Sequence, residues 1–250
     1  QGLLAVHSNQ LGRKIISNIT RFIEGKALRA CDHLVFLSNA MVEQAVKAYG
    51  LSRDKCSMCY PFVTPIPRNR NSSELQGLFQ SKKHHIVYSG ALGEKQNPYQ
   101  LLTFFKRLIA KRSDVCTHIF SRGHIFESLR KKEAQFSNGR LFFHDLVPEE
   151  NLWELYSRSS IQIIPQAPGT GDGAFPSKLP NLLLAGVPVL GICEKNSELA
   201  HILKESGGGR AVHTWDAEVI VEQVGLYLQE VSAQSRENRQ RRLQSYVEEK

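Results

Sequence analysis

The sequence comprises 250 residues, of which 41% are hydrophobic and 22% charged, so it can build a sizeable core and is neither disordered nor fibrous. Its formal net charge of +8 indicates an acidic partner, such as nucleic acid, anionic lipid or a phosphorylated ligand. No uninterrupted apolar run reaches the roughly 20 residues of a membrane-spanning helix. Because the sequence begins with Gln1 rather than Met, we expect its true N-terminus, with any targeting signal, to lie upstream.

The positive charge is concentrated in the first quarter of the chain. Residues 1–70 contain 10 basic and 4 acidic side chains, a local net charge of +6. Apolar residues recur there at helical spacing beside basic ones, which predicts an amphipathic helix with a cationic side. Two interpretations stay open, a solvated helix face or a surface that binds anionic lipid. The apolar positions are Leu11, Ile15, Ile19, Phe22, Ile23 and Ala27, and the basic ones are Arg13, Lys14, Arg21, Lys26 and Arg29.

Short elements follow this helix. The pattern predicts a strand over 33–37, a helix over 41–49 that is capped by Ser38 or Asn39, and a strand over 56–62. The polar, proline-containing run that comes next has no periodicity and predicts a domain boundary. We therefore expect a first domain with its linker over 1–75.

The cysteines are odd in number and scattered, which favours a reducing compartment. Cys56 and Cys59 form a lone C-x2-C without a second pair, so buried structural thiols are preferred to a metal or redox site. The nine histidines show no H-x3-H spacing, and none pairs convincingly with a cysteine. We accordingly expect no metal site and no cofactor.

From residue 84 onward, short strand patterns alternate with helical patterns. This alternation predicts βαβ units with a parallel sheet, and thus a doubly wound, Rossmann-like α/β domain over 76–234, followed by a charged helix over 235–250. Ligands of such sheets bind at the carboxyl ends of the strands. The predicted strands are 85–89, 118–121, 141–144, 161–165 and 187–193, and the predicted helices are 98–112, 125–136, 149–158, 177–185, 197–205 and one from Asp216 to 232.

The first chemical motif follows the strand that ends at Ser89. Gly90 and Gly93 allow backbone amides to approach a ligand closely, and Lys95 places a cation where phosphate could bind. An ordinary glycine turn accounts for the two glycines equally well. Arg122 and Gly123, after the next strand, either line the same cleft or form a plain βα turn.

The second motif is the segment over 165–181, a long glycine-rich loop that leads into a helix. Free amides at a helix start, with Ser177 as a candidate cap and Lys178 as a cation, suit a diphosphate. Asp172 would repel phosphate and is better suited to sugar hydroxyls. Neither G-x-G-x-x-G nor G-x4-G-K-[ST] occurs, so the usual dinucleotide and P-loop assignments lack support.

The motif segments after residue 84 and the order in which they occur resemble the C-terminal domain of family 4 glycosyltransferases. The most similar subgroup is the bacterial exopolysaccharide transferases of the colanic-acid-cluster type. An earlier stretch, ALRACDHLVFLSNAMVEQAVKAYGL, is similar to the end of the family's N-terminal domain. The resemblance covers about residues 20–232. The matching runs are YSGALGEKQNP, FSRG, FFHDLVPEENLWELYS, IQIIPQ, GAFPSKLPNLLLAGVPVLG and NSELAHILKESGGGRAV.

This resemblance implies a GT-B architecture, with the active site between two Rossmann-like halves, the first truncated here. The C-terminal half would hold a nucleotide sugar, without metal. By position, Gly90, Ala91 and Lys95 would lie near the diphosphate, Arg122 and Gly123 near the nucleotide, and Leu146 and Val147 near the base. The donor sugar would face Gly171, Asp172, Gly173, Ala174 and Phe175, with Ser177 and Asn181 completing the donor site.

One departure concerns the Glu-x7-Glu pair of many family members. Those positions are Gly173 and Asn181 here, so sugar contacts must come from amides or from Asp172, while Asn181 can still bond a ribose hydroxyl. The family's reaction retains anomeric configuration and depends on electrostatic stabilisation of the leaving diphosphate. Lys95, Lys178 and Asp172 are therefore the candidate catalytic residues. A module that binds nucleotide sugars without transfer is the alternative.

The expected partners follow from this resemblance and from the charge. They are a nucleotide-sugar donor, a glycan or polyprenyl-linked acceptor, and an anionic membrane surface for the basic first quarter. No nucleic acid is expected, because zinc-finger spacing and interleaved aromatic and basic residues are missing. The expected location is cytoplasmic, with peripheral attachment to the cytoplasmic membrane face as an option.

Overall fold

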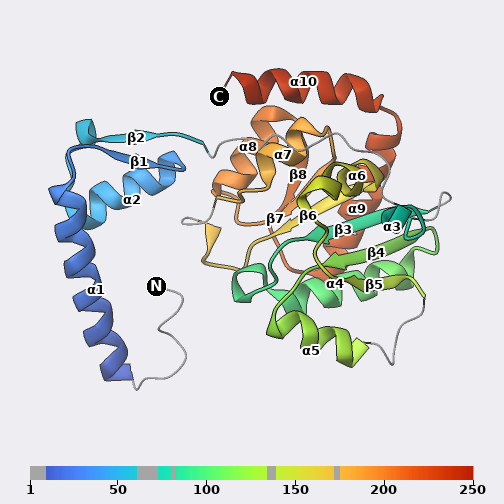
Figure 1. Cartoon of the computed structure of the whole chain (residues 1–250), viewed down its shortest axis with the longest axis horizontal. Coiled ribbons are helices and arrows are strands. Elements are labelled where there is room, and N and C mark those ends of the chain that lie inside the picture. Colours follow the sequence, from blue (N-terminus) through green and yellow to red (C-terminus); the bar gives the residue numbers. More distant parts are fainter. Residues whose placement is uncertain (1–9, 61–72, 80–82, 134–138, 172–174, 250) are drawn as a thin grey trace. The chain divides into compact units, whose positions relative to one another are not determined.

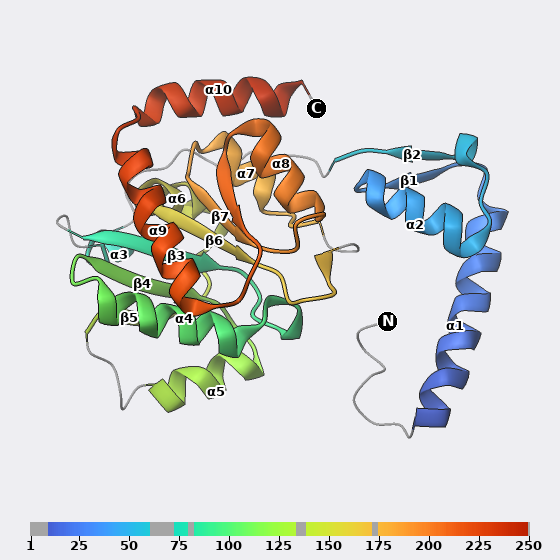
Figure 2. The same ribbon diagram turned by 180° about the vertical axis from the view of Figure 1, so that it is seen from behind.

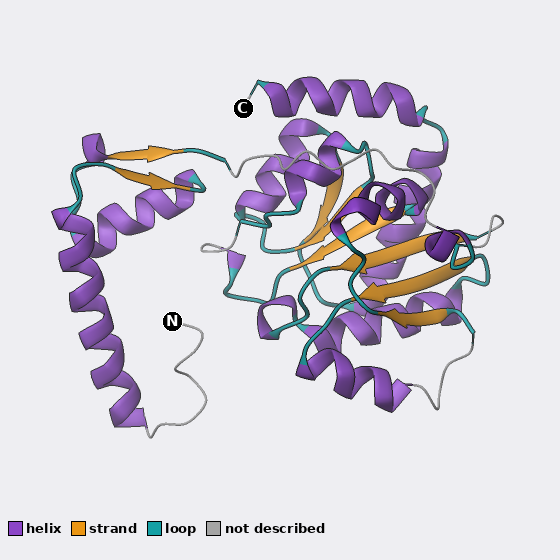
Figure 3. Ribbon diagram, viewed as in Figure 1, coloured by secondary structure: helices purple, strands orange, loops and turns teal. Residues whose placement is uncertain are grey.

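A computed structural model of the chain describes residues 10–60, 73–79, 83–133, 139–171 and 175–249. The chain divides into two compact units, Gln1–Tyr60 and Pro61–Lys250, which are described separately. Figures 1 and 3 trace the elements of each unit. The domain limits that the sequence predicts, at residues 75 and 234, stay predictions.

The smaller unit places a two-stranded parallel sheet against a helix. It consists of α1 (Gln10–Ala30), β1 (Leu34–Phe36), α2 (Asn39–Tyr49), a 3-10 turn (Arg53–Lys55) and β2 (Cys56–Met58). The side chain of Ser38 accepts a hydrogen bond from the Met41 amide at 3.1 Å, which confirms the predicted cap, and α2 ends at Gly50 in the left-handed conformation. Val42, Ala45, Leu51 and Cys56 form its core.

Three expectations for this unit have different outcomes. Cys56 is buried as expected, but Cys59 is exposed, because the strand ends at Met58 and leaves Cys59 beyond the core. The predicted continuation of that strand to residue 62 runs into positions outside the described residues. The amphipathic helix is confirmed as α1, whose side chains Ile19, Phe22 and Ile23 are 54 to 61% exposed.

The larger unit contains a six-stranded parallel sheet in the order β5-β4-β3-β6-β7-β8. The chain builds outward from β3 to β5, then returns to the other side of β3 and continues to β8, so the order reverses between β3 and β6. This reversal confirms the doubly wound α/β fold. The strands are β3 (His84–Ser89), β4 (Val115–Phe120), β5 (Leu141–His144), β6 (Ile161–Pro165), β7 (Val189–Ile192) and β8 (Gly209–Val212).

Helices cover the sheet on both faces. In the reverse view, α4 and α9 cross in front of the strands and pack against each other (Figure 2). The helices are α3 (Ser73–Gln76), α4 (Pro98–Lys111), α5 (His124–Glu133), α6 (Leu152–Arg158), α7 (Leu179–Leu184), α8 (Glu198–Ser206), α9 (Ala217–Ser232) and α10 (Arg236–Glu248), with 3-10 turns at Glu94–Gln96 and Glu149–Asn151.

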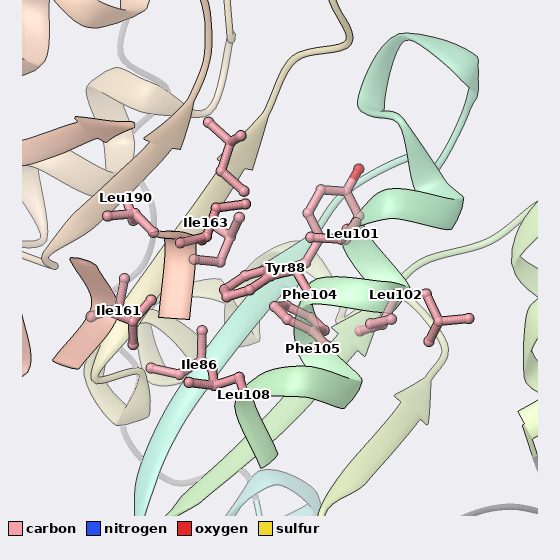
Figure 4. Packing of buried hydrophobic residues seen from close by; sticks show 14 of the residues in the cluster. Ile86, Tyr88, Leu101, Leu102, Phe104, Phe105, Leu108, Ile161, Ile163 and Leu190 are labelled. Carbon is pink, nitrogen blue, oxygen red and sulfur yellow. The ribbon is translucent and has the colours of Figure 1, made fainter. Parts of the chain in front are cut away.

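The main core lies between the sheet and α4. Figure 4 shows Ile86 and Tyr88 of β3 facing Phe104 and Leu108 of α4. Fully burying one such apolar side chain contributes about 1.5–3 kcal/mol, so this layer fixes the position of β3 and of the turn that follows it. The apolar spacing that predicted a helix over 98–112 is the spacing that fills this layer.

The sequence analysis missed one strand and assigned one helix cap wrongly. The strand β8 was not expected, because the segment Gly209–Val212 is short, begins with glycine and carries an arginine. Ser177 does not cap α7: the helix begins at Leu179 with Lys178 at the cap position, and no side-chain cap bond is formed there. Pro180 in the first turn suits a helix start at this point, since that position needs no amide donor.

A row of histidines crosses three strands of the same sheet. Nδ1 of His85 in β3 lies 2.9 Å from Nε2 of His118 in β4, and Nδ1 of His118 lies 3.1 Å from Nε2 of His144 in β5. The Phe79 and Phe142 rings stack on His118 at centroid distances of 4.9 and 5.0 Å. Sequence spacing alone does not reveal this row, because strand pairing brings its members together.

The last helix, α10, packs on α7. Nε of Arg239 donates to the Gly186 carbonyl at 2.9 Å, and Leu243 is fully buried. Gly186 has a φ of 63°, and a Cβ there would lie 2.7 Å from Cβ of Gln240, so glycine is required at this contact. Across the described parts of the chain, no helix combines the length and apolar character needed to cross a membrane.

Candidate functional site

A pocket of about 490 Å³ opens at the carboxyl ends of β3 and β6, where the strand order reverses. This is the location at which doubly wound sheets hold their ligands. Its walls come from the ends of the two strands, the turn after β3, the segment between β5 and α6, α6 itself and the loop before α7. The lining residues are Tyr88, Ser89, Gly90, Ala91, Lys95, Gln96, Leu146, Val147, Leu152, Leu155, Tyr156, Ile164, Pro165, Gln166, Thr170, Phe175, Pro176, Ser177 and Lys178.

The turn after β3 is fixed at several points. The Tyr88 hydroxyl donates to the Ala91 carbonyl at 2.6 Å, and the Gly90 amide donates to the Phe120 carbonyl of β4 at 3.0 Å. Gly90 has a φ of 139°, a backbone conformation that residues other than glycine rarely adopt. The glycine that the sequence singled out is thus required by the backbone of the turn.

Lys95 lies on a short 3-10 turn at the rim of the pocket. Its side chain is exposed, and its carbonyl accepts a hydrogen bond from the Ala167 amide at 2.8 Å. This bond ties the turn after β3 to the loop after β6, so the two motifs that the sequence identified separately form one structural unit. Asn97 then turns the chain in the left-handed conformation into α4.

Lys178 lines the pocket, and its ammonium is bonded to the backbone of two strands. Its Nζ donates to the Ser89 carbonyl at 2.9 Å and to the Ile163 carbonyl at 3.1 Å, and it lies 4.7 Å from the centre of the Tyr88 ring. The ammonium thus bonds to backbone at the pocket floor. Burial lowers the pKa of Lys178 to about 7, whereas the two carbonyls and the ring face favour the charged form.

The tyrosines of the pocket stay protonated near neutral pH. Burial raises the pKa of Tyr156 to about 12, and it also raises the pKa of Tyr88. Neither phenol can therefore act as a base at this pH. Among the described residues, no group of histidine, cysteine, aspartate or glutamate side chains could hold a metal ion.

The structure brings together much of the predicted donor site. Arg122, Gly123, Gly171 and Asn181 are described but do not line the pocket, and Asp172, Gly173 and Ala174 lie outside the described residues. The predicted residues that line it are Gly90, Ala91, Lys95, Leu146, Val147, Phe175, Ser177 and Lys178.

The predicted residues away from the lining have defined surroundings. Arg122 and Gly123 are exposed at the end of β4. A Cβ on Gly171 would lie 2.9 Å from a carboxylate oxygen of Glu194, so the loop packs closely against Glu194 at this position. Oδ1 of Asn181 is buried without a hydrogen-bond partner among the described residues.

Sequence inspection missed several wall residues. Tyr88 and Ile164 lie in the strands, Tyr156 lies in α6, and Gln166 and Thr170 belong to the loop after β6. The strand residues were assigned to the core by their apolar pattern. Their position within two residues of a carboxyl strand end is the signal that could have identified them, because that edge carries the ligand site of such folds.

Comparison with known proteins agrees with this geometry. Residues 69–247 match the family model described as glycosyl transferases group 1. No curated protein matches significantly. Many solved structures do, at identities that establish only the fold.

Three solved structures illustrate the similarity. WaaG, a glycosyltransferase involved in lipopolysaccharide biosynthesis, shares 16% identity with a TM-score of 0.63, over 86% of this chain and 58% of its own. Sucrose-phosphate synthase from Thermosynechococcus elongatus shares 14% with a TM-score of 0.70, over 91% and 57%. Anabaena HepE, solved with UDP and glucose, shares 12% with a TM-score of 0.69, over 96% and 68%.

The chain spans little more than half the length of WaaG and of the synthase. The family match extends over most of the chain and covers every strand of the six-stranded sheet. The chain therefore belongs to the glycosyl transferases group 1 family, and its larger unit has the Rossmann-like fold of GT-B glycosyltransferases.

Proposed function

We propose that the larger unit binds the nucleotide-sugar donor of a glycosyltransferase. The observation that carries this proposal is the pocket at the switch point, with the exposed cation Lys95 at its rim and the Gly90 turn at its floor. A cation and approachable backbone amides suit a diphosphate, and apolar side chains such as Leu146 and Val147 suit a base. HepE, which has this fold, was solved with UDP and glucose, which supports the same class of ligand.

The proposed reaction transfers the sugar to a glycan or polyprenyl-linked acceptor, with retention, in exopolysaccharide or glycoconjugate biosynthesis of the family 4, colanic-acid type. Charge builds up on the leaving diphosphate in the transition state, so a preorganised cation lowers the barrier. Lys95 is the side chain proposed for this role. Asp172 is proposed to contact the donor sugar, and the reaction is proposed to need no metal.

A donor panel tests this proposal. A full-length version, with both Rossmann-like halves complete, is incubated with UDP-, GDP- and ADP-sugars and membrane extract, and labelled product is measured. Transfer supports the proposal. Saturable donor binding with neither transfer nor slow donor hydrolysis favours the alternative, a module that binds nucleotide sugars without using them.

Lys95→Ala tests the assigned cation. Loss of a charged hydrogen bond, about 1–3 kcal/mol, corresponds to roughly 5- to 150-fold weaker binding of the nucleoside diphosphate in titration calorimetry. Lys131→Ala is the matched control, because Lys131 is an exposed lysine on α5 outside the pocket lining. Equal affinities of the wild type and Lys95→Ala would remove Lys95 from the site.

We also propose that the smaller unit binds an anionic membrane from the cytoplasmic side. Ile19 and Ile23 of α1 are exposed beside Arg21 and Lys26 on the same helix, and Nζ of Lys26 lies 5.1 Å from the centre of the Phe22 ring. Each basic residue near an anionic bilayer contributes about 1 kcal/mol. Binding to anionic vesicles should weaken with salt, and equal binding to neutral vesicles would contradict this role.

A further inference from the structure

The pairing of β3 with β6 stops short of the pocket. Their register has two pairs, Ile86 with Ile161 and Val87 with Gln162. On their other sides, β3 stays paired with β4 as far as Ser89, and β6 stays paired with β7 as far as Pro165. The two central strands therefore separate over their last residues, and the pocket opens at this point.

Lys178 bridges this gap. The carbonyls that it binds belong to Ser89, the last residue of β3, and to Ile163, one position beyond the last β3–β6 pair. A lysine ammonium has three donors and no acceptor, so it can bond to carbonyls of both strands at once. The Tyr88 ring lies against the same ammonium, and the Tyr88 hydroxyl holds the Ala91 carbonyl.

We propose that Lys178 is a positioning residue, whose ammonium holds the separated ends of β3 and β6 at the spacing that the donor diphosphate requires. This inference rests on the proposed donor site. Lys178 acts through the backbone: Ser89 leads directly into the Gly90 turn, and Ile163 leads into the loop that Ala167 ties to Lys95. Removal of the side chain leaves two carbonyls facing each other across the gap, and deprotonation leaves them only the weaker N–H donors of a neutral amine.

The protonation state of Lys178 provides a specific readout. The pKa of about 7 implies that the ammonium is lost progressively as the pH rises above neutrality. The other titratable groups of the pocket lining are Tyr88, Tyr156 and Lys95, and both tyrosines have raised pKa values. An arginine at position 178 keeps its charge throughout this range and can still donate to two carbonyls.

The experiment measures the affinity of UDP, GDP and ADP for the 250-residue chain by calorimetry at pH 6.5, 7.5 and 8.5. We expect the wild-type affinity to fall about tenfold from pH 6.5 to 8.5, because the bridging ammonium is lost. Lys178→Arg should bind with little dependence on pH above 7, and Lys178→Met should bind at least about tenfold more weakly at pH 6.5. Folded Lys178→Met with wild-type affinity and wild-type pH dependence would overturn the proposal.

A ligand-free measurement separates this inference from the proposed function. In the wild type, the amide resonances of Gly90 and Ala91 should shift with a midpoint near pH 7, and in Lys178→Arg they should not. If the wild type binds no nucleoside diphosphate, the proposed function fails, and these resonances still test the bridge. If Lys178→Met does not fold, Lys178→Arg decides: a wild-type pH profile in that variant overturns the positioning role.

Discussion

Two basic side chains of the larger unit, Lys178 and His118, are held in opposite ways. Lys178 lies where the central strands separate, and two backbone carbonyls and a ring face surround its ammonium. His118 lies on β4, which is paired on both sides, and its two ring nitrogens contact His85 and His144. A lysine has only donors and needs free acceptors, whereas a neutral imidazole has one donor and one acceptor and can join a row.

This contrast shows which kind of basic side chain belongs to a ligand site. Between the central strands, carbonyls become free for a side chain where the ladder ends, and the β3–β6 ladder ends at the pocket. Within a complete ladder, a buried imidazole finds only other side chains, here histidine and phenylalanine. Perturbed pKa values occur in both places, so the pKa alone does not locate the site.

The largest predicted effect concerns the stability of the bridge. Lys178→Met removes two bonds from backbone carbonyls, at about 1–3 kcal/mol for each unsatisfied group, and should lower the free energy of unfolding by about 3 kcal/mol at pH 6.5. Urea denaturation measures this loss. Lys178→Arg should recover most of it, and a Lys178→Met protein as stable as the wild type would show that the two carbonyls do not need the ammonium.

The second prediction concerns the histidine row and acid. Burial, with smaller contributions from His144 and His85, lowers the pKa of His118 to about 2, and burial lowers that of His144 to about 4. The unfolded chain therefore binds more protons than the folded one below pH 6.5, and stability falls as the pH falls. Between pH 7 and pH 5, His118 alone should cost about 2 kcal/mol, measured as a lower urea midpoint.

His118→Phe is the variant that isolates this effect. Phenylalanine fits between the rings of Phe79 and Phe142 and does not titrate. The variant should lose less stability than the wild type between pH 7 and pH 5. Arg130 and Asp145, which act on His144 in opposite directions, remain in both proteins. Equal losses in the two proteins would assign the acid sensitivity to other groups.

The smallest predicted effect separates the ring of Tyr88 from its hydroxyl. Tyr88→Phe keeps the ring face below Lys178 and removes the bond to the Ala91 carbonyl, so stability should fall by only about 1 kcal/mol. Nucleotide affinity should change less than in Lys178→Met. A loss as large as that of Lys178→Met would mean that the hydroxyl, rather than the lysine bridge, fixes the turn.

Much of the fold could be predicted from the sequence. Alternating strand and helix patterns predicted the parallel sheet, and the polar N-cap at Ser38 and the apolar face of α4 were identified correctly. The Gly90 turn was also predicted, because its backbone demands glycine and the demand is local. Local preferences of this kind depend on residues that are neighbours in the sequence, so they can be predicted without knowing the distant contacts.

The contacts that depend on pairing between distant segments could be seen only in the structure. Lys178 was predicted as a cation for phosphate, and this stays a prediction. Its bonds to Ser89 and Ile163, which exist because the strands separate there, could not be read from the sequence. The row of His85, His118 and His144 exists because the register of three strands aligns residues far apart in sequence. The sequence by itself indicated a GT-B glycosyltransferase, most of the strands and helices in order, and the glycine turn. Strand register decided which basic side chain bridges the site and which packs in the sheet.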